Sequence, residues 1–368
     1  MEEKLTCAFC GEVLSEDTAY TFEGKLMCEN CYNENTRTCE NCGERIWNDE
    51  DEGDENITLC NHCREYHYTT CENCGRLIHN DDANYEDDDS DYPYCDECFR
   101  KIEEKAIKSY GYKPEPIFYG SGNLFMGVEL EIDKGGEDDS NADVLLKTAN
   151  SLSEHIYCKH DGSINDGFEI VSHPMTLDYH TNNMCWLDVM NKALQMNYRS
   201  HQTSTCGLHI HINRSALGKD HNDIEATIAR IVHFVELHWN ELLKFSRRTE
   251  DNINRWANRY GIATTAQDTY KNAKDKRMGR YVAVNLENYD TIEFRLFRGT
   301  LRHKTLLATL QLIDEICKRA IRLNDKVLEG MSWSDFVIGI PNDKVELIEY
   351  LKSKKLYVND VVPELEEA

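Results

Sequence analysis

The sequence predicts an α+β protein in which a largely antiparallel sheet carries helices on one face and is preceded by small metal-stabilised fingers. Two observations lead to this prediction. In the second half, short segments that alternate apolar and polar residues are interleaved with long helical periodicities, the pattern of an antiparallel sheet with one buried face. In the first hundred residues, twelve cysteines form six Cys-x-x-Cys pairs, a spacing typical of small domains built around metal ions.

The cysteine pairs form an internal repeat. Cys7, Cys39 and Cys71 are each 32 residues apart, and the two pairs of each unit are separated by 17, 17 and 20 residues. This spacing matches tetrahedral four-cysteine zinc sites, and the sequence shows no secretory context that would favour disulfides. The predicted ligands of three structural Zn²⁺ ions are Cys7, Cys10, Cys28, Cys31, Cys39, Cys42, Cys60, Cys63, Cys71, Cys74, Cys95 and Cys98.

The zinc repeat is interpreted as an interaction module. A site closed by four thiolates leaves no open position for catalysis, and its metal supplies folding free energy. The stretch from Thr21 to Tyr32 resembles the second half of a LIM zinc finger, but seven residues separate the units. The module is therefore LIM-like or zinc-ribbon-like, and we expect it to dock a protein partner or a substrate.

The charge of the chain bears on its partners. The net charge is −26, and residues 1–100 hold 27 acidic and 7 basic side chains. Such an acidic segment repels phosphate backbones, which argues against a nucleic-acid partner. The sequence has no apolar run long enough to span a membrane and no signal-peptide pattern at Met1, so we expect a cytoplasmic protein that does not contact a membrane.

Three regions are predicted along the chain: three tandem zinc fingers over residues 1–100, a short helix and linker over 101–123, and an α+β domain with a helical C-terminal part over 124–368. Glycines and prolines between Gly111 and Gly122 interrupt regular structure, which sets the linker. Helical periodicity predicts helices in the last region at about Ala142–His155, Asp178–Asn197, Asp223–Phe245, Lys304–Arg322 and Asp343–Lys352.

Four strands of the last region carry the polar groups: Gly127–Ile132, Gly167–His173, Cys206–Ile212 and Thr291–Gly299. Residues two apart in a strand share a face. Each strand therefore presents a set of charged or polar side chains on one side, namely Glu129 with Glu131, Glu169 with His173, His209 with His211, and Glu293 with Arg295.

These sets favour a metal site. An isolated Glu-x-Glu is more often the solvated face of an edge strand, but two carboxylates within about 7 Å on one face are costly unless a cation or a proton neutralises them, and the arrangement recurs on several strands. Carboxylates with an imidazole suit Mg²⁺ or Mn²⁺. Arg280, Arg295 and Arg298 are suited to neutralising a transferring phosphoryl group, whereas Arg302 is interpreted as a surface salt-bridge residue.

Four motifs in order resemble the amidoligase family, over about residues 124–325. They are Gly127-Val-Glu-Leu-Glu-Ile132; His160-Asp-Gly-Ser163 with Gly167-Phe-Glu-Ile-Val-Ser-His-Pro174; Cys206-Gly-Leu-His-Ile-His-Ile212; and Arg280, Val284-Asn-Leu286 and Thr291-Ile-Glu-Phe-Arg-Leu-Phe-Arg-Gly-Thr300. The family belongs to the carboxylate-amine ligase superfamily, with glutamine synthetase and glutamate-cysteine ligase. The resemblance implies a glutamine synthetase-like antiparallel sheet.

The resemblance also implies roles for single residues. Two or more Mg²⁺ (or Mn²⁺) ions would be held by Glu129, Glu131, Glu169, His209 and Glu293, the ATP phosphates would be bound by Arg280, Arg295 and Arg298, and His211 would face substrate or phosphate. The second acidic segment offers only Glu169, where glutamine synthetase offers two glutamates. Asp161 or His173 would have to compensate.

The implied reaction is ATP-dependent. A carboxylate is phosphorylated to an acyl phosphate, and an amine then displaces phosphate to give an amide. The carboxylate and the amine belong to a protein, a peptide or a small metabolite. Two alternatives stay open: a zinc-finger adaptor whose ligase-like domain is inactive, and a phosphotransferase on the same fold.

Overall fold

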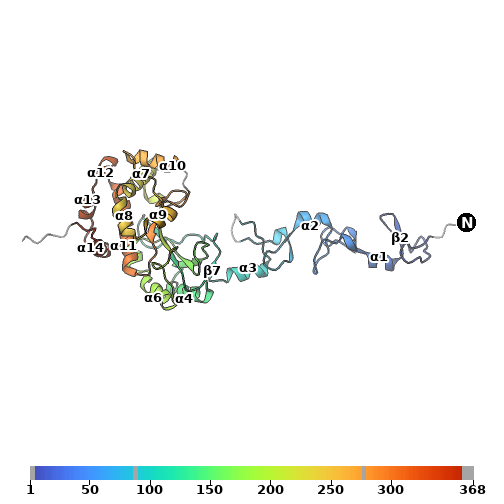
Figure 1. The fold of residues 1–368 in the computed structure, drawn as a ribbon. Helices are drawn as coiled ribbons and strands as arrows, with labels where there is room; N and C mark the ends of the chain where they lie inside the picture. Colours follow the sequence, from blue (N-terminus) through green and yellow to red (C-terminus); the bar gives the residue numbers. More distant parts are fainter. Residues whose placement is uncertain (1–4, 86–89, 276–278, 359–368) are drawn as a thin grey trace, which may run out of the picture. The chain divides into compact units, whose positions relative to one another are not determined.

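The computed structural model describes residues 5–85, 90–275 and 279–358. The chain divides into two compact units, Met1–Glu104 and Lys105–Ala368. We call them the zinc unit and the sheet unit and describe each by itself (Figure 1). Among the described residues, no helix is both long and apolar enough to span a membrane.

Each finger of the zinc unit has a two-stranded hairpin and a short helix. The described hairpin of the first finger directly precedes Cys28, whereas those of the second and third fingers flank the first cysteine pair. Each helix begins directly after the third cysteine of a finger, so Cys28, Cys60 and Cys95 are the N-cap residues. The described hairpin strands are β1 (Tyr20–Phe22), β2 (Lys25–Met27), β3 (Thr36–Thr38), β4 (Arg45–Trp47), β5 (Tyr68–Thr70) and β6 (Leu77–His79), and the helices are α1 (Glu29–Asn35), α2 (Asn61–His67) and α3 (Asp96–Glu103), with short 3₁₀ turns η1 (Asn48–Glu50) and η2 (Asn80–Asp82).

The turn after each first cysteine pair depends on glycine. Gly11, Gly43 and Gly75 adopt φ values of +75°, +77° and +73°, which only glycine adopts without strain. The amide of Gly43 donates to the carbonyl of Cys39 at 2.9 Å, and the other two fingers repeat this bond. Each finger has its own small core, made of its cysteines and a few apolar side chains such as Met27, Leu59 and Ile78.

The sheet unit is built on a seven-stranded sheet in the order β12-β13-β11-β8-β10-β9-β7. Its pairs are antiparallel except β7 with β9, which is parallel. The strands are β7 (Ile107–Lys108), β8 (Met126–Ile132), β9 (Ile156–Lys159), β10 (Phe168–Ser172), β11 (Gly207–Asn213), β12 (Val284–Asn285) and β13 (Thr291–Arg298).

Helices bury the apolar face of this sheet. Val128, Leu130, Ile170, Leu208 and Ile210 are fully buried in one core with residues of α4, α6, α7 and α11, while α4 and α6 lie side by side (Figure 1). The helices are α4 (Asp139–Ala149), α5 (Leu177–Asn182), α6 (Trp186–Gln195), α7 (His221–Leu237), α8 (Trp239–Ser246), α9 (Glu250–Trp256), α10 (Ala266–Asp275), α11 (His303–Arg322), α12 (Asp325–Glu329), α13 (Trp333–Ile338) and α14 (Val345–Ser353), with the 3₁₀ turn η3 (Arg214–Ala216). The predicted α+β class is confirmed.

The structure differs from the sequence expectations at several element boundaries. The helix expected over Asp178–Asn197 is two helices, because the chain turns before Trp186, and the one expected over Asp223–Phe245 is interrupted at His238. The stretch 101–123, assigned to a helix and linker, also contributes strand β7 to the sheet. Isolated two-residue strands such as β7 carry no periodicity, so tertiary pairing decides them.

Candidate active site

The four thiols of each finger come together as predicted. Facing sulfur atoms lie 3.7 Å apart for Cys10 and Cys28, 3.8 Å for Cys42 and Cys60, and 3.9 Å for Cys74 and Cys95. Sulfurs at the corners of a tetrahedron, each about 2.3 Å from one zinc ion, are about 3.8 Å apart. The three clusters are Cys7, Cys10, Cys28 and Cys31; Cys39, Cys42, Cys60 and Cys63; and Cys71, Cys74, Cys95 and Cys98, and they suit structural zinc.

Backbone amides favour the thiolate at the first cysteine of each finger. The amide of Cys10 has the largest effect on Cys7 and lowers its pKa to about 6. Burial alone would raise the pKa of Cys39 and Cys71, but amide donors such as those of Cys60 and Cys95 outweigh it and lower both values to about 6. Thiolates are the form that binds metal.

The sheet unit gathers the predicted acidic and imidazole side chains on the face opposite the helices. The strand pairing sets them in rows: His211 pairs with Glu293, and His209 pairs with Glu129. In the next row, Glu131 pairs with Glu169. Because directly paired residues point to the same side of a sheet, the four central strands present one continuous polar surface.

Glu129 is the centre of this polar cluster. One of its carboxylate oxygens lies 3.1 Å from Nδ1 of His209 and the other 3.0 Å from Nε2 of His211. Burial alone would raise the pKa of Glu129, but the charge of His211 and the hydrogen bonds from both imidazoles hold it well below its ordinary value. Glu129 is therefore ionised and joins the two histidines.

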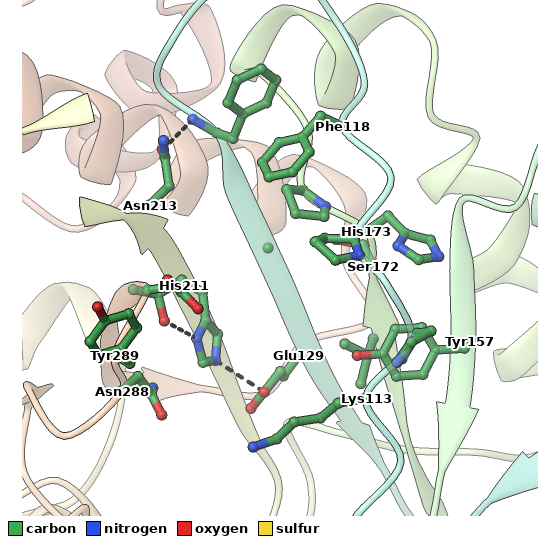
Figure 2. Close-up of a pocket in the computed structure, with 18 of the residues that line it drawn as sticks. Lys113, Phe118, Glu129, Tyr157, Ser172, His173, His211, Asn213, Asn288 and Tyr289 are labelled. Carbon is green, nitrogen blue, oxygen red and sulfur yellow. Dashed lines mark hydrogen bonds and ion pairs between the residues drawn. The ribbon is translucent and has the colours of Figure 1, made fainter. Parts of the chain in front are cut away.

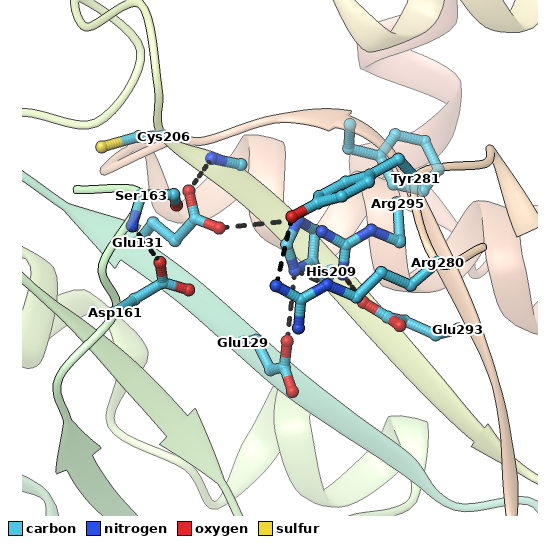
Figure 3. A network of polar contacts seen from close by, with 12 residues as sticks. Glu129, Glu131, Asp161, Ser163, Cys206, His209, Arg280, Tyr281, Glu293 and Arg295 are labelled. Carbon is cyan, nitrogen blue, oxygen red and sulfur yellow. Dashed lines mark hydrogen bonds and ion pairs between the residues drawn. The ribbon is translucent and has the colours of Figure 1, made fainter. Parts of the chain in front are cut away.

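Glu131 and Glu169 are buried more deeply. Glu131 accepts a hydrogen bond from the amide of Gly207 at 2.5 Å, and its other oxygen lies 3.6 Å from Nε2 of His209 (Figure 3). Burial raises the pKa of Glu131, and burial with the charges of Glu129 and Glu131 raises the pKa of Glu169 well above its usual range. The charge of Asp161 acts in the same direction on both, which indicates that it lies nearby.

Two overlapping sets of ligand atoms have the spacing of a metal site. One atom each from Glu129, Glu169 and His209 lie within 4.8 Å of one another, and so do atoms of Glu129, His211 and Glu293. His211, predicted to face substrate, thus lies where it could also hold a metal ion. Several carboxylates gathered within this distance of one another are a donor set that a divalent cation would neutralise.

Glu293 is held by its neighbours on the last two strands. Its side chain is buried and forms an ion pair with Arg295, and its other oxygen accepts from Nδ2 of Asn285 at 2.8 Å. Sequence reasoning gave no role to Asn285, although the asparagine occurs in the quoted Val-Asn-Leu motif. Its role follows from its position opposite Glu293 in the strand register, which only the structure shows.

The three predicted arginines are held differently. Arg280 donates to the hydroxyl of Tyr281 at 3.2 Å and also to that of Tyr110, and Figure 3 shows its guanidinium between the hydroxyl of Tyr281 and the carboxylate of Glu129. Arg298 reaches the polar face through an irregularity in β13. Leu208 pairs with Phe297 whereas Ile210 pairs with Phe294, so one extra residue of β13 lies opposite His209 and the alternation shifts. Arg298 therefore pairs with Gly207 on the face of His209.

Arg248 is a site residue that sequence reasoning missed. Arg247, the C-cap of α8, has φ +64°, and this turn directs the chain back so that Nε of Arg248 donates to the carbonyl of Phe297 at 3.2 Å. A Cβ on Gly207 would lie 2.7 Å from the guanidinium of Arg248 and 2.6 Å from Nε2 of His209. The glycine of the Cys-Gly-Leu-His motif thus makes room for both groups.

His173 has other contacts. Its Nδ1 accepts from the amide of Ile117 at 3.2 Å, and its Nε2 lies 3.9 Å from a carboxylate oxygen of Glu154. Of the two residues proposed to compensate for the missing glutamate, Asp161 is the one whose charge acts on Glu131 and Glu169, and Figure 3 shows it beside Glu131.

A cavity of about 430 Å³ adjoins the cluster, with Glu129 and His211 among its lining residues. Figure 2 shows the imidazole of His211 pointing toward the carboxylate of Glu129 on one side of it. Other walls are apolar or aromatic and include Phe118 and Tyr157, and Lys113 also lines the cavity. Residues 113–118, assigned to the linker, thus line a pocket beside the candidate active site.

A family model described as "Putative amidoligase enzyme" matches residues 133–317. The chain belongs to this family. The match includes Glu169, His209, His211, Glu293 and Arg295, so most of the polar cluster lies inside the amidoligase region, while β8 with Glu129 and Glu131 lies just before it. The resemblance predicted from the four motifs is confirmed.

Ten chains of solved structures also match. One is a bifunctional glutathione synthetase from Pasteurella multocida, with a TM-score of 0.36 and 10% identity, covering 63% of this chain and 46% of that one. The amidoligase chain described here therefore spans less than half the length of that protein. A comparison with curated proteins gave no match.

Proposed function

We propose that this amidoligase-family protein joins a carboxylate to an amine at the expense of ATP, through an acyl phosphate. The observation that supports this most directly is the position of Glu129, shared by two sets of metal-ligand atoms on one sheet face with Arg295 and Arg280 beside it. Carboxylates that hold divalent cations next to guanidinium groups are the arrangement that phosphoryl transfer requires.

The polar cluster would hold two Mg²⁺ or Mn²⁺ ions. Glu129, Glu169 and His209 would hold one, Glu129, His211 and Glu293 the other, and Glu131 would orient His209. Oxygen-rich ligand sets suit these hard cations. When bound, the ions would offset the negative charge of the phosphates and of the reacting carboxylate.

The reaction then follows from the arrangement of the charged groups. An oxygen of the substrate carboxylate attacks the γ-phosphorus of ATP, the bond to the bridging oxygen breaks, and ADP leaves. The amine nitrogen attacks the carbonyl carbon of the acyl phosphate and loses a proton, and inorganic phosphate leaves. Arg280, Arg295 and Arg298 would bind the phosphoryl oxygens throughout, so positioning and charge stabilisation supply most of the acceleration.

The cavity beside Glu129 would receive the amine. Its carboxylate Asp290 would attract an ammonium group, and Phe118, Phe125 and Tyr157 offer apolar surface for the body of the substrate. The zinc unit would dock a protein partner or present a protein or peptide substrate, because its four-thiol clusters leave no coordination position for chemistry.

The test is release of ADP from Mg·ATP with a panel of carboxylates and amines. Arg295→Ala and Glu129→Gln should each lower kcat by about 10³-fold, in line with the loss of a group that stabilises transition-state charge. Glu137→Gln, which changes an exposed carboxylate of the same unit, should leave kcat unchanged. Equal turnover in all four proteins would refute the proposal.

Product analysis by mass spectrometry separates the ligase from its alternatives. An amide together with ADP and phosphate supports the ligase, and a stable phosphorylated product would identify a phosphotransferase instead. Calorimetry with Mg·ATP addresses the adaptor: a wild-type protein that binds no nucleotide would have lost the chemistry of the family.

A further inference from the structure

Three segments far apart in the sequence meet at the Gly207 end of β11. They are residues 199–203 before β11, residues 298–302 after β13, and residues 247–248 between α8 and α9. Nη2 of Arg247 donates to the carbonyl of Arg298 at 2.9 Å, and the amide of Gly299 donates to that of Cys206 at 3.1 Å. A Cβ on Gly299 would clash with Oγ of Ser200, so residues 199–203 lie at the same place. The three segments carry what we call the arginine cluster: Arg199, His201, Arg247, Arg248, Arg298 and Arg302.

The arginine cluster begins at the candidate active site and extends away from it. Arg298 lies opposite Gly207 on the polar face, and the guanidinium of Arg248 approaches Gly207 so closely that a Cβ there would lie 2.7 Å from it. Arg302, the N-cap of α11, is exposed and makes no side-chain cap hydrogen bond. The cluster therefore leads from His209 to the surface of the unit.

The cluster carries positive charge that no direct ion pair with a described carboxylate neutralises, although the charge of Glu131 acts on Arg248. No described carboxylate lies within ion-pair distance of any of its five arginines, although Arg230, Arg259 and Arg295 of the same unit all have such partners. Arg302, interpreted from sequence as a salt-bridge residue, thus has no such partner among the described side chains. In a chain with a net charge of −26, this is a marked local exception.

Two further observations show that the charges are close together and partly desolvated. Nε of Arg247 is buried and has no hydrogen-bond partner among the described groups. Burial, followed by the charges of Arg247, Arg298, Arg302 and Arg199, lowers the pKa of His201, and burial lowers the pKa of Arg248 to about 10. Half-buried like charges that lie close together without carboxylate partners are costly, so a bound anion would stabilise the cluster.

We propose that the arginine cluster binds a polycarboxylate, the acid substrate of the ligase reaction proposed above, on which this assignment rests. Guanidinium groups match carboxylates with two parallel hydrogen bonds. The cluster extends from Arg298 to Arg302 and contains more positively charged groups than one carboxylate can pair with. One carboxylate would lie beside His209 for phosphorylation, and the others would be held toward Arg302 and Arg199.

The test measures binding rather than turnover. Calorimetry on the full chain uses citrate and a tri-glutamate peptide as polycarboxylate probes and Mg·ATP as the nucleotide probe. Arg302→Ala and Arg199→Ala should each weaken binding of the carboxylate probe roughly tenfold, the loss of one charge-assisted contact, and leave Mg·ATP affinity within twofold. Arg302→Lys should lose less. Arg322→Ala, at the other end of α11 and exposed, is the matched control.

The outcomes are distinct. Binding of citrate alone supports a small polycarboxylate, and binding of the peptide alone supports an acidic peptide. The protein could bind a carboxylate probe through the arginine cluster and yet neither bind nor hydrolyse ATP. That outcome would support the polycarboxylate site and refute the ligase proposal. If the wild type binds neither carboxylate probe, or if Arg302→Ala weakens Mg·ATP instead, the cluster is not a polycarboxylate site.

Discussion

The zinc unit and the sheet unit of this protein are each stabilised in a different way. In the zinc unit, each finger has a core of a few side chains around four cysteines, and its ligands lie close together in sequence. In the sheet unit, one large apolar core supports the fold, and the site joins Glu129 to Glu293 across the sheet. Metal ligation replaces burial in the first unit, and long-range pairing builds the site in the second.

Removal of zinc is expected to produce the largest difference in stability between the zinc unit and the sheet unit. A high-affinity chelator should unfold residues 5–85 of the zinc unit, because metal binding supplies on the order of 10 kcal/mol to such small domains, and should leave the large core of the sheet unit folded. Hydrogen–deuterium exchange with mass spectrometry reports both units at once. Unchanged protection in residues 5–85 after chelation, or equal loss in both units, would contradict the comparison.

Gly207→Ala should damage the active site without unfolding the sheet unit. The added methyl would lie 2.6 Å from Nε2 of His209 and 2.7 Å from the guanidinium of Arg248, so both groups must move. A displacement of this size is expected to lower kcat/KM for ADP release about 100-fold. Gly330→Ala is the control, since its methyl would only touch the carbonyl of Lys326 at 3.5 Å. An active, normally melting Gly207→Ala protein would show that the glycine is not required for space.

The contrast between local metal ligands and long-range strand pairing also decides how much of each unit could be predicted from the sequence. In the zinc unit, the 32-residue period and the pair spacing identified all twelve thiols, because the ligands of a finger are local. In the sheet unit, the two-residue alternation placed Glu129 with Glu131 and His209 with His211 on one face, which is also a local property. Strand order and register brought them together, and periodicity does not contain that information.

The positions of three further site residues, the predicted Arg298 and the missed Arg248 and Asn285, depend on tertiary structure. Arg298 faces the site because β13 is irregular opposite His209, and Arg248 reaches it through the left-handed turn at Arg247. Asn285 acts through its register partner Glu293. An extra residue in a strand or a turn of unusual φ is fixed by packing against neighbouring elements, so alternation alone could not locate these groups.

Acid should weaken the core of the sheet unit through His180. The ring is fully buried, with Nε2 at 2.9 Å from the carbonyl of Met126 and Nδ1 accepting from the indole of Trp186 at 3.1 Å. Burial lowers the pKa of His180 to about 4. The unfolded chain, with an ordinary histidine pKa near 6.5, therefore binds more protons between these values, and stability is lost as pH falls through this window, by about 2 kcal/mol at pH 5.

Denaturant unfolding of wild type and His180→Gln at pH 7.5 and pH 5 measures this effect. Zinc release and the other titrating groups affect both proteins, so the difference between them isolates His180. The advantage of the wild type should shrink by about 2 kcal/mol at the lower pH. If the difference in stability between wild type and His180→Gln does not change with pH, the pKa of His180 is the same in the folded protein as in the unfolded chain.

Gly43→Ala should have the smallest effect, and it forms a pair with Gly207→Ala. At Gly43 nothing lies within 4 Å of an added methyl, but φ is +77°, so the cost is backbone strain of about 1 kcal/mol. Zinc affinity of that finger, measured by competition with a chromogenic chelator, should fall about fivefold, and Gly43→Asn should cost less because asparagine tolerates this conformation. A 100-fold loss at Gly43 would indicate crowding that the structure does not show. Glycine-to-alanine substitution thus strains a backbone angle at Gly43 of the zinc unit, whereas at Gly207 of the sheet unit it crowds neighbouring side chains.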